Sequence, residues 1–475
     1  MDKKIYIQKL NYKYFNYIWF SLSVALFIFC GANLFQILAS SIYPYEFDTS
    51  YVINMVIGTL KHGIPNFNNV YGNSIWTCSD LIKGACFNPN IANYQQNDVL
   101  PIDHSSGYLL VLITTFFTKL SLFLNEGKII DSQIFISYII KGYSSYVVSV
   151  YLFSFTSLIF CIFFVDKIIK INLFEKIIFI LMNLSIPFCG IYSVTDRIIG
   201  EFSAVIYLSC SYIIFSISSL AIIKFIIGEK YLDETTTYKL FNNLNYVSII
   251  LFLNLLLSVE SKSSVLPTAL AVFISQLSII SSKNIITRYL FKKTTNFSFL
   301  NLRFFRKIFI FFIGFFSLFI ANKFIPLIKY LIFKRDNFLL FVAKSREFIN
   351  YQSNAGRSWG GDSINFFTNI QNNLSTYNLA KLLIPISLFL SFILFLGLIY
   401  QSLKYLKEKK VLQKLFLGYY SFFLITCNFL IILGAWSYSL IYKFPYPRTI
   451  FISIIISLLQ PICLTLNYKS IQKQI

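Results

Sequence analysis

The sequence predicts an all-α, polytopic membrane protein with about ten transmembrane helices, and three observations support this class. Hydrophobic residues make up 56% and charged residues 13% of the 475 positions, whereas soluble domains carry about a quarter charged residues. Aromatic residues account for 19%, dominated by 53 Phe and 32 Tyr. Several stretches of about 16–22 residues are almost free of charge, which is the length that crosses roughly 30 Å of hydrocarbon. A soluble multidomain enzyme and a disordered or fibrous chain are thereby excluded.

The formal charge of +21 fits membrane topology better than nucleic-acid binding, because Lys and Arg accumulate in cytoplasmic loops. The sequence shows no glycine-rich phosphate loop, zinc-type Cys/His spacing or hydrolase nucleophile elbow. Residues 17–39 are too long for a signal-peptide core and lack a small-residue cleavage site. We therefore interpret them as a retained first span, and we expect no nucleic-acid partner.

Ten stretches are predicted to cross the bilayer. They are 17–39, 146–165, 177–194, 202–223, 244–259, 265–280, 308–327, 382–400, 415–436 and 450–466. An eleventh stretch, 107–124, is apolar enough to cross but ambiguous.

The distribution of charge decides the role of 107–124. If this stretch stays outside, the cytoplasmic segments hold 24 Lys and Arg against 7 Asp and Glu, and the exterior holds 17 against 13. The densest basic loop, 283–307, then lies inside, as does the lysine run 404–414. Full crossing would place both outside, against the positive-inside tendency. We therefore expect 107–124 to lie at the outer interface or to dip in and return. Both termini are then cytoplasmic, in the plasma (inner) membrane.

The whole chain, 1–475, is predicted to form a single membrane domain without internal repeats. Its large first exterior loop spans about 41–141, and a second exterior loop spans about 329–381. The spans 244–259 and 265–280 are short and joined by a polar turn, so we expect this hairpin to stop short of full depth.

Two carboxylates, Glu46 and Asp48, stand where the chain leaves the first span, in the sequence YEFDTSY (45–51). Aromatic neighbours exclude water and raise a carboxylate's pKa, which suits a general base. Acids and tyrosines at a membrane surface are also ordinary solvent-exposed residues. From spacing alone, both interpretations stay open.

The residues that follow extend the pattern. A G-x-P turn, GIP (63–65), precedes NVYG (69–72), and PIDHSSGYL (101–109) opens the ambiguous helix. The turns DRIIGE (196–201) and ESKSSVLP (260–267) combine acids with Arg197 and Lys262. In this order and placement the motifs resemble the GT-C superfamily of glycosyltransferases, which use sugars activated on a polyprenyl phosphate. The resemblance covers the first 270 residues best and weakens afterwards.

This resemblance implies juxtamembrane helices in the first exterior loop and an inverting sugar transfer on the exterior (periplasmic) face. The donor would be a polyprenyl-phosphate sugar, and the acceptor a glycan, lipid or protein. Asp48 matches the family's catalytic base, with Glu46 as the alternative. Two departures concern the substrate class more than the reaction. Thr49 follows Asp48 where many members have adjacent acids, and Asp103-His104 replaces a Pro-Pro pair before Tyr108.

An anionic leaving phosphate requires cations at the membrane edge. The candidate substrate-binding residues are Lys262, Arg346, Arg357, Arg448, Arg197, Glu201, His104, Tyr108 and Trp359. Each basic residue taken alone is equally typical of a phospholipid headgroup contact, and Arg197 also suits pairing with Asp196 or Glu201. Trp359 either stacks on a sugar or anchors the interface.

No cofactor is required by this reading. Glu46-x-Asp48 could ligate a divalent cation, but no metal site is predicted. Cys78 and Cys86 are expected to form a disulfide outside the membrane. Two other functions remain open: a polymerase or ligase for lipid-linked glycans, which would depend on exterior arginines, and a non-catalytic flippase or transporter. A transporter typically carries ionisable residues inside its spans.

Overall fold

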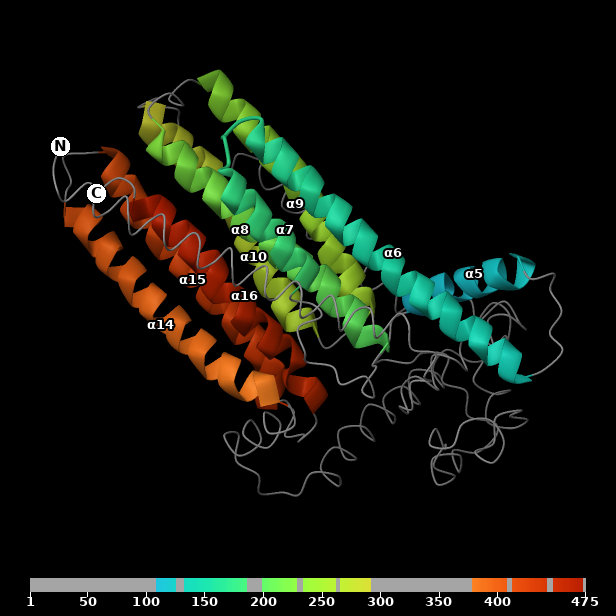
Figure 1. Cartoon of the computed structure of the whole chain (residues 1–475). Coiled ribbons are helices and arrows are strands. Elements are labelled where there is room, and N and C mark those ends of the chain that lie inside the picture. Colours follow the sequence, from blue (N-terminus) through green and yellow to red (C-terminus); the bar gives the residue numbers. More distant parts are fainter. Residues whose placement is uncertain are drawn as a thin grey trace, which may run out of the picture.

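A computed structural model describes residues 108–124, 132–185, 199–228, 234–261, 265–291, 378–407, 412–441 and 447–472. Apart from one turn at 265, the regular elements of these ranges are α-helices (Figure 1). They are α5 (Tyr108–Leu124), α6 (Ser132–Asp166), α7 (Leu173–Ser185), α8 (Ile199–Ile227), α9 (Glu234–Ser261), α10 (Leu266–Phe291), α14 (Asn378–Lys407), α15 (Leu412–Ile441) and α16 (Pro447–Gln472).

Six of these helices, α6, α8, α9, α14, α15 and α16, are long and apolar enough to cross a membrane. The described part is thus a helical bundle suited to a lipid bilayer, as the composition predicted. The predicted spans 17–39 and 308–327 lie outside the described residues, and α7 covers only the beginning of 177–194. The total of about ten spans therefore stays a prediction.

The hairpin of α9 and α10 differs from its prediction. Helix α9 has 28 residues, and its segment Thr235–Val259 qualifies as a full span. Helix α9 is longer than the predicted span 244–259 because its polar beginning continues the same helix ahead of the apolar stretch, and the depth that the hairpin reaches stays a prediction. Helix α10 has 26 residues, of which Leu266–Ser282 form the apolar part.

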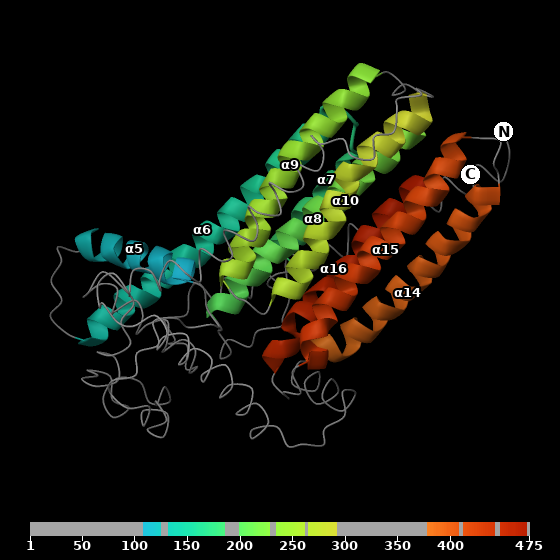
Figure 2. The same cartoon turned by 180° about the vertical axis from the view of Figure 1, so that it is seen from behind.

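Hydrogen bonds between helices show that the pairs α8 and α9, α15 and α16, and α6 and α9 run antiparallel. Ser258 near the end of α9 donates to the carbonyl of Ala204 near the start of α8, at 2.7 Å. Ser453 near the start of α16 donates to Ala435 O near the end of α15, also at 2.7 Å. Asn243 near the start of α9 donates to Phe164 O near the end of α6, at 3.3 Å. The helix ends consequently gather at two ends of the bundle (Figures 1 and 2).

One of these ends, here called the basic end, is where α6, α8, α10, α14 and α16 finish and α9 and α15 begin. Most of the basic residues in the described helices and the α6–α7 turn belong to it. They are Lys167, Lys170, Lys176, Lys224, Lys239, Lys283, Arg288, Lys404, Lys407, Lys414 and Lys469. The other end is called the opposite end below.

Helices α8 and α16 are the most buried, and they pack against each other in the middle of the bundle. Helices α6 and α14 lie further out and expose large apolar side chains such as Phe153, Phe160, Phe389 and Phe392. Exposed Phe and Leu over the length of a helix suit contact with lipid chains rather than water. This arrangement places the serine-rich sequence of α8 in the protein interior.

Helix α5 lies across the first half of α6 and also contacts α9, outside the row of parallel and antiparallel helices (Figures 1 and 2). Its buried face carries Thr114 and Thr118, whose hydroxyl donates to Thr114 O at 2.8 Å. Its exposed face carries Phe116 and Phe123. This oblique course agrees with a helix that does not run through the bundle. Its predicted place at the outer interface stays a prediction.

Candidate functional site

The predicted site residues that the structure describes all lie in first turns of helices. Glu201 is in the first turn of α8, Arg448 is the second residue of α16, and Tyr108 is the first residue of α5. Arg197 and Lys262 lie just outside the described residues, two positions before α8 and one position after α9. The remaining predicted residues also lie outside them: Asp48, Glu46, His104, Arg346, Arg357 and Trp359. The same holds for Cys78 and Cys86.

The first turns of α8 and α16 lie at the opposite end of the bundle. The bond from Ser258 to Ala204 places the end of α9 beside the start of α8. Gly434, near the end of α15, lies so close to the start of α10 that an added Cβ would stand 2.9 Å from Pro267 O. The fold thus brings Glu201, Arg448 and the chain positions flanking Arg197 and Lys262 to one end. Tyr108 begins a helix that packs on α6 and α9 instead.

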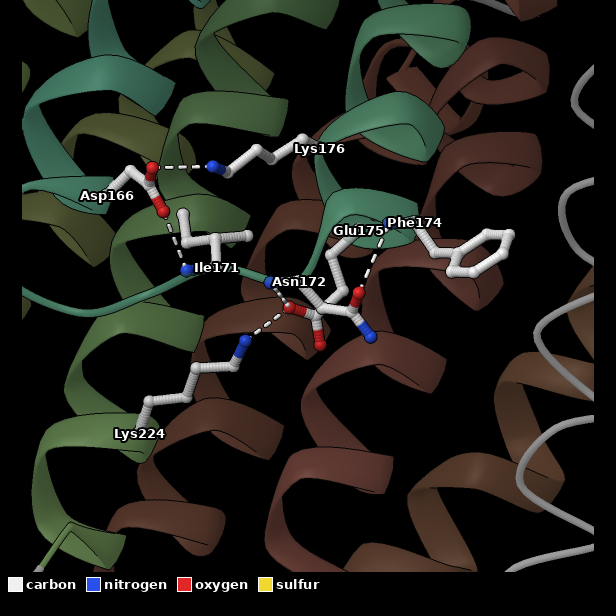
Figure 3. Close-up of polar contacts among 7 residues, drawn as sticks. All are labelled: Asp166, Ile171, Asn172, Phe174, Glu175, Lys176 and Lys224. Atoms are coloured by element: carbon white, nitrogen blue, oxygen red, sulfur yellow. Dashed lines mark hydrogen bonds and ion pairs between the residues drawn. The ribbon is translucent and has the colours of Figure 1, made fainter.

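A polar cluster that the sequence reasoning missed lies at the basic end, where α6 turns into α7 (Figure 3). Asp166 accepts a bond from Ile171 N at 2.9 Å and pairs with Lys176 at 2.5 Å. Glu175 of α7 pairs with Lys224 of α8. The side chains of Glu175 and Lys224 are only 7% and 18% exposed, so this second pair is largely desolvated.

Local sequence explains why the chain turns here. Asn172 precedes α7, and its side-chain oxygen accepts a bond from Phe174 N at 3.4 Å. Glu175 in turn accepts a bond from Asn172 N at 3.0 Å. This is a capping box, which satisfies amides that a helix start leaves free. The spacing Asn172-x-x-Glu175 is the signal in the sequence from which the helix start could have been predicted.

The cluster connects three helices but leaves neither of its carboxylates unpaired. Asp166 and Glu175 each have a lysine and a backbone amide as partners. A general base needs a carboxylate that can take up a substrate proton. Both carboxylates here already form an ion pair with a lysine and accept a backbone hydrogen bond. The arrangement therefore fixes α7 against α6 and α8 and has a structural role.

Between the two ends, the buried polar groups of the described helices are uncharged. Tyr212 of α8 donates to Asn428 Oδ1 of α15 at 2.9 Å, and Gln460 of α16 donates to Asn428 O at 2.9 Å. Gln276 of α10 donates to Ser248 of α9 at 2.8 Å and to Ser218 of α8 at 3.2 Å. These bonds join the helices at mid-depth. The described residues at this depth include no Asp, Glu, Lys, Arg or His.

The described residues contain no group of three or more His, Cys, Asp or Glu that could hold a metal ion. Glu46 and Asp48, the two acids with the spacing for a divalent cation, lie outside the described residues.

The fold and the apolar helices define the class as a multi-pass helical membrane protein. Comparison with protein-family models, with curated proteins and with solved structures finds no match for this chain.

Proposed function

We propose that the protein is an integral-membrane, inverting glycosyltransferase that moves a sugar from a polyprenyl phosphate to an exterior glycan, lipid or protein acceptor. One observation carries the proposal. The acidic and basic motifs that resemble the GT-C superfamily flank helix ends that the bundle gathers on one side, away from the basic end. Glu201 and Arg448 belong to these ends, and Arg197 and Lys262 adjoin them in the chain.

The reaction needs one base and a cationic site. The acceptor's oxygen or nitrogen attacks the anomeric carbon and gives its proton to the carboxylate of Asp48, or of Glu46 in the alternative. The bond between the anomeric carbon and the phosphate oxygen breaks, and its electron pair leaves with the polyprenyl phosphate. Lys262, Arg346, Arg357, Arg448 and Arg197 are the candidates to stabilise this anion.

The positive-inside tendency gives the orientation. The basic end would face the cytoplasm of a cell whose plasma (inner) membrane holds the bundle. The opposite end and both long loops would then face the exterior, where a donor with its prenyl chain in the bilayer presents its phosphate at the membrane surface.

A transporter or flippase of lipid-linked glycans is the competing class. Ionisable side chains within spans are typical of transport pathways, whereas the described helices carry hydroxyls and carboxamides at mid-depth. The catalytic proposal is therefore preferred.

The test uses the full chain in lipid nanodiscs. The donors are a panel of farnesyl-phosphate hexoses and pentoses, and a cell-envelope extract that contains glycans, lipids and proteins supplies the acceptor. Released farnesyl phosphate is the readout. Loss of a general base typically lowers a rate by a factor of about 100 to 10,000, so Asp48→Asn should lower release by that factor while donor binding persists. Lys262→Ala or Arg357→Ala should weaken donor binding as well.

Glu46→Gln is the matched control. Near-normal release by Asp48→Asn together with loss in Glu46→Gln would transfer the role of base to Glu46. Wild-type rates in both variants would exclude the first-loop acids from the mechanism. If the folded wild-type protein releases farnesyl phosphate from none of the donors, the transferase proposal is refuted. Movement of a lipid-linked glycan across the bilayer without such release would establish the transporter function.

A further inference from the structure

The corner of the basic end where α6 finishes beside the start of α9 carries two exposed lysines. Asn243 of α9 donates to Phe164 O of α6 at 3.3 Å. Lys167 follows Phe164 toward the basic end, and Lys239 precedes Asn243 by about one turn in the same direction. Both lysines are exposed. The adjacent ends of α6 and α9 are visible in both views (Figures 1 and 2).

The charges of this corner are not neutralised within the described residues. Of the acids nearby, Asp166 and Glu175 are paired with Lys176 and Lys224, and Glu234 is the first residue of α9, five positions before Lys239. Lys167 instead lies over an aromatic ring, with its Nζ 4.5 Å from the centroid of Phe163. Cation–π contact orients an ammonium without neutralising it. The corner therefore presents a net positive charge at the edge of an apolar surface.

Below each lysine, toward the middle of the bundle, an exposed apolar row continues along the helix. On α6 this row consists of Phe163 and Phe160, and on α9 of Tyr246 and Leu253. The spacing of three, four or seven residues keeps each row on the same helix face as its lysine. Phe163 is 53% and Tyr246 61% exposed, so both rows are open to acyl chains. A molecule with an anionic head and apolar tails matches this combination.

We propose that Lys167 and Lys239 form a binding site for the phosphate of an anionic phospholipid from the leaflet at the basic end, with its acyl chains along the two apolar rows. The site is separate from the proposed sugar-transfer region at the opposite end. Its partner class follows from charge and apolar surface alone, so it holds whether or not the transferase proposal is correct.

The experiment compares lipid retention by native mass spectrometry. The full-length protein is purified from micelles that contain equal amounts of phosphatidylglycerol and phosphatidylcholine, and the ratio of the two retained lipids is measured. A lysine near an anionic surface contributes about 1 kcal/mol, which is roughly fivefold in a binding ratio. Lys167→Gln with Lys239→Gln should therefore lower the ratio by about 25-fold. Each single variant should lower it by about fivefold.

The matched control is Lys404→Gln with Lys407→Gln, two exposed lysines on α14 at the same end. The proposal expects this pair to change the ratio less than twofold. An equal drop in the control pair would indicate surface charge without a site, and an unchanged ratio in the Lys167/Lys239 double variant would refute the site. Displacement of the lipid by excess inorganic phosphate would show that the corner binds the phosphate group alone, and this would refute the proposed lipid site. Exposed substitutions of this kind rarely affect folding, and size-exclusion profiles verify this.

Discussion

The ion pair of Glu175 and Lys224 leads to the sharpest prediction on stability. Both side chains lie at the end of the bundle and are mostly buried, at 7% and 18% exposure. Removing one partner of a fully buried pair costs about 3–5 kcal/mol, whereas exposed pairs contribute at most about 1 kcal/mol. At this intermediate position we expect Glu175→Gln to lower the free energy of unfolding by about 2–3 kcal/mol. The glutamine oxygen still accepts the bond from Asn172 N, so the capping box is retained.

Lys224→Met should cost a similar amount, because it leaves the Glu175 carboxylate without its lysine. The double variant removes both charges, and replacing both partners of a buried pair is often nearly neutral. Its unfolding free energy should therefore return to within about 1 kcal/mol of wild type. The assay is reversible unfolding by SDS in mixed micelles, followed by circular dichroism of the helices.

The pair of Asp166 and Lys176 is the internal control. These side chains are 33% and 26% exposed, so Asp166→Asn should cost less than about 1 kcal/mol. Equal losses for Asp166→Asn and Glu175→Gln would show that burial does not set the strength of these pairs. Additive losses in the Glu175/Lys224 double variant would show that the two residues do not stabilise each other.

Two further predictions concern packing and topology. Gly434→Ala would place a Cβ 2.9 Å from the Pro267 carbonyl and force α15 away from α10, so we expect a loss of about 1–3 kcal/mol in the same SDS assay. Gly397→Ala meets side-chain atoms of Tyr468, at 3.1 Å, instead of backbone and should cost less; equal losses would refute the backbone clash as the cause. Reporter fusions after Leu124 and Lys293 should give an exterior and a cytoplasmic signal, respectively, and an exterior signal at Lys293 would overturn the predicted orientation.

Hydrophobic runs predicted the existence of the described helices well and their boundaries less well. The predicted span 146–165 covers only the apolar part of α6, which begins at Ser132, because a polar segment with Lys141 continues the same helix. Likewise α8 extends from the predicted 202–223 to Ile227, and Lys224 is tolerated there because Glu175 pairs with it. A hydropathy pattern predicts which residues suit the hydrocarbon core of a bilayer, but it does not predict the residue at which a helix ends.

The polar cluster at the α6–α7 turn could be predicted only in part. The capping box is local, so Asn172 and Glu175 reveal it by their spacing. The partner of Glu175 is Lys224, 49 positions later in the chain, and no local pattern links them. For the proposed catalytic site, motif order supplies the candidate residues. The structure adds the shared end of the bundle to which Glu201 and Arg448 belong.

The buried serines of α8 have a consequence for how the chain is assembled in the membrane. Ser211, Ser218 and Ser219 each donate to a carbonyl four residues earlier in their own helix, at 2.9, 2.9 and 3.0 Å. Such bonds are satisfied as soon as the helix forms, so these three hydroxyls are already bonded in lipid before α9, α10 and α16 are synthesised. Two buried glutamines instead donate to other helices. Gln276 of α10 donates to Ser248 of α9 at 2.8 Å, and Gln460 of α16 donates to Asn428 O of α15 at 2.9 Å. The side-chain nitrogens of these glutamines therefore reach their acceptors only after α10 has docked on α8 and α9 and α16 has docked on α15, which favours these late associations in a solvent that offers no water.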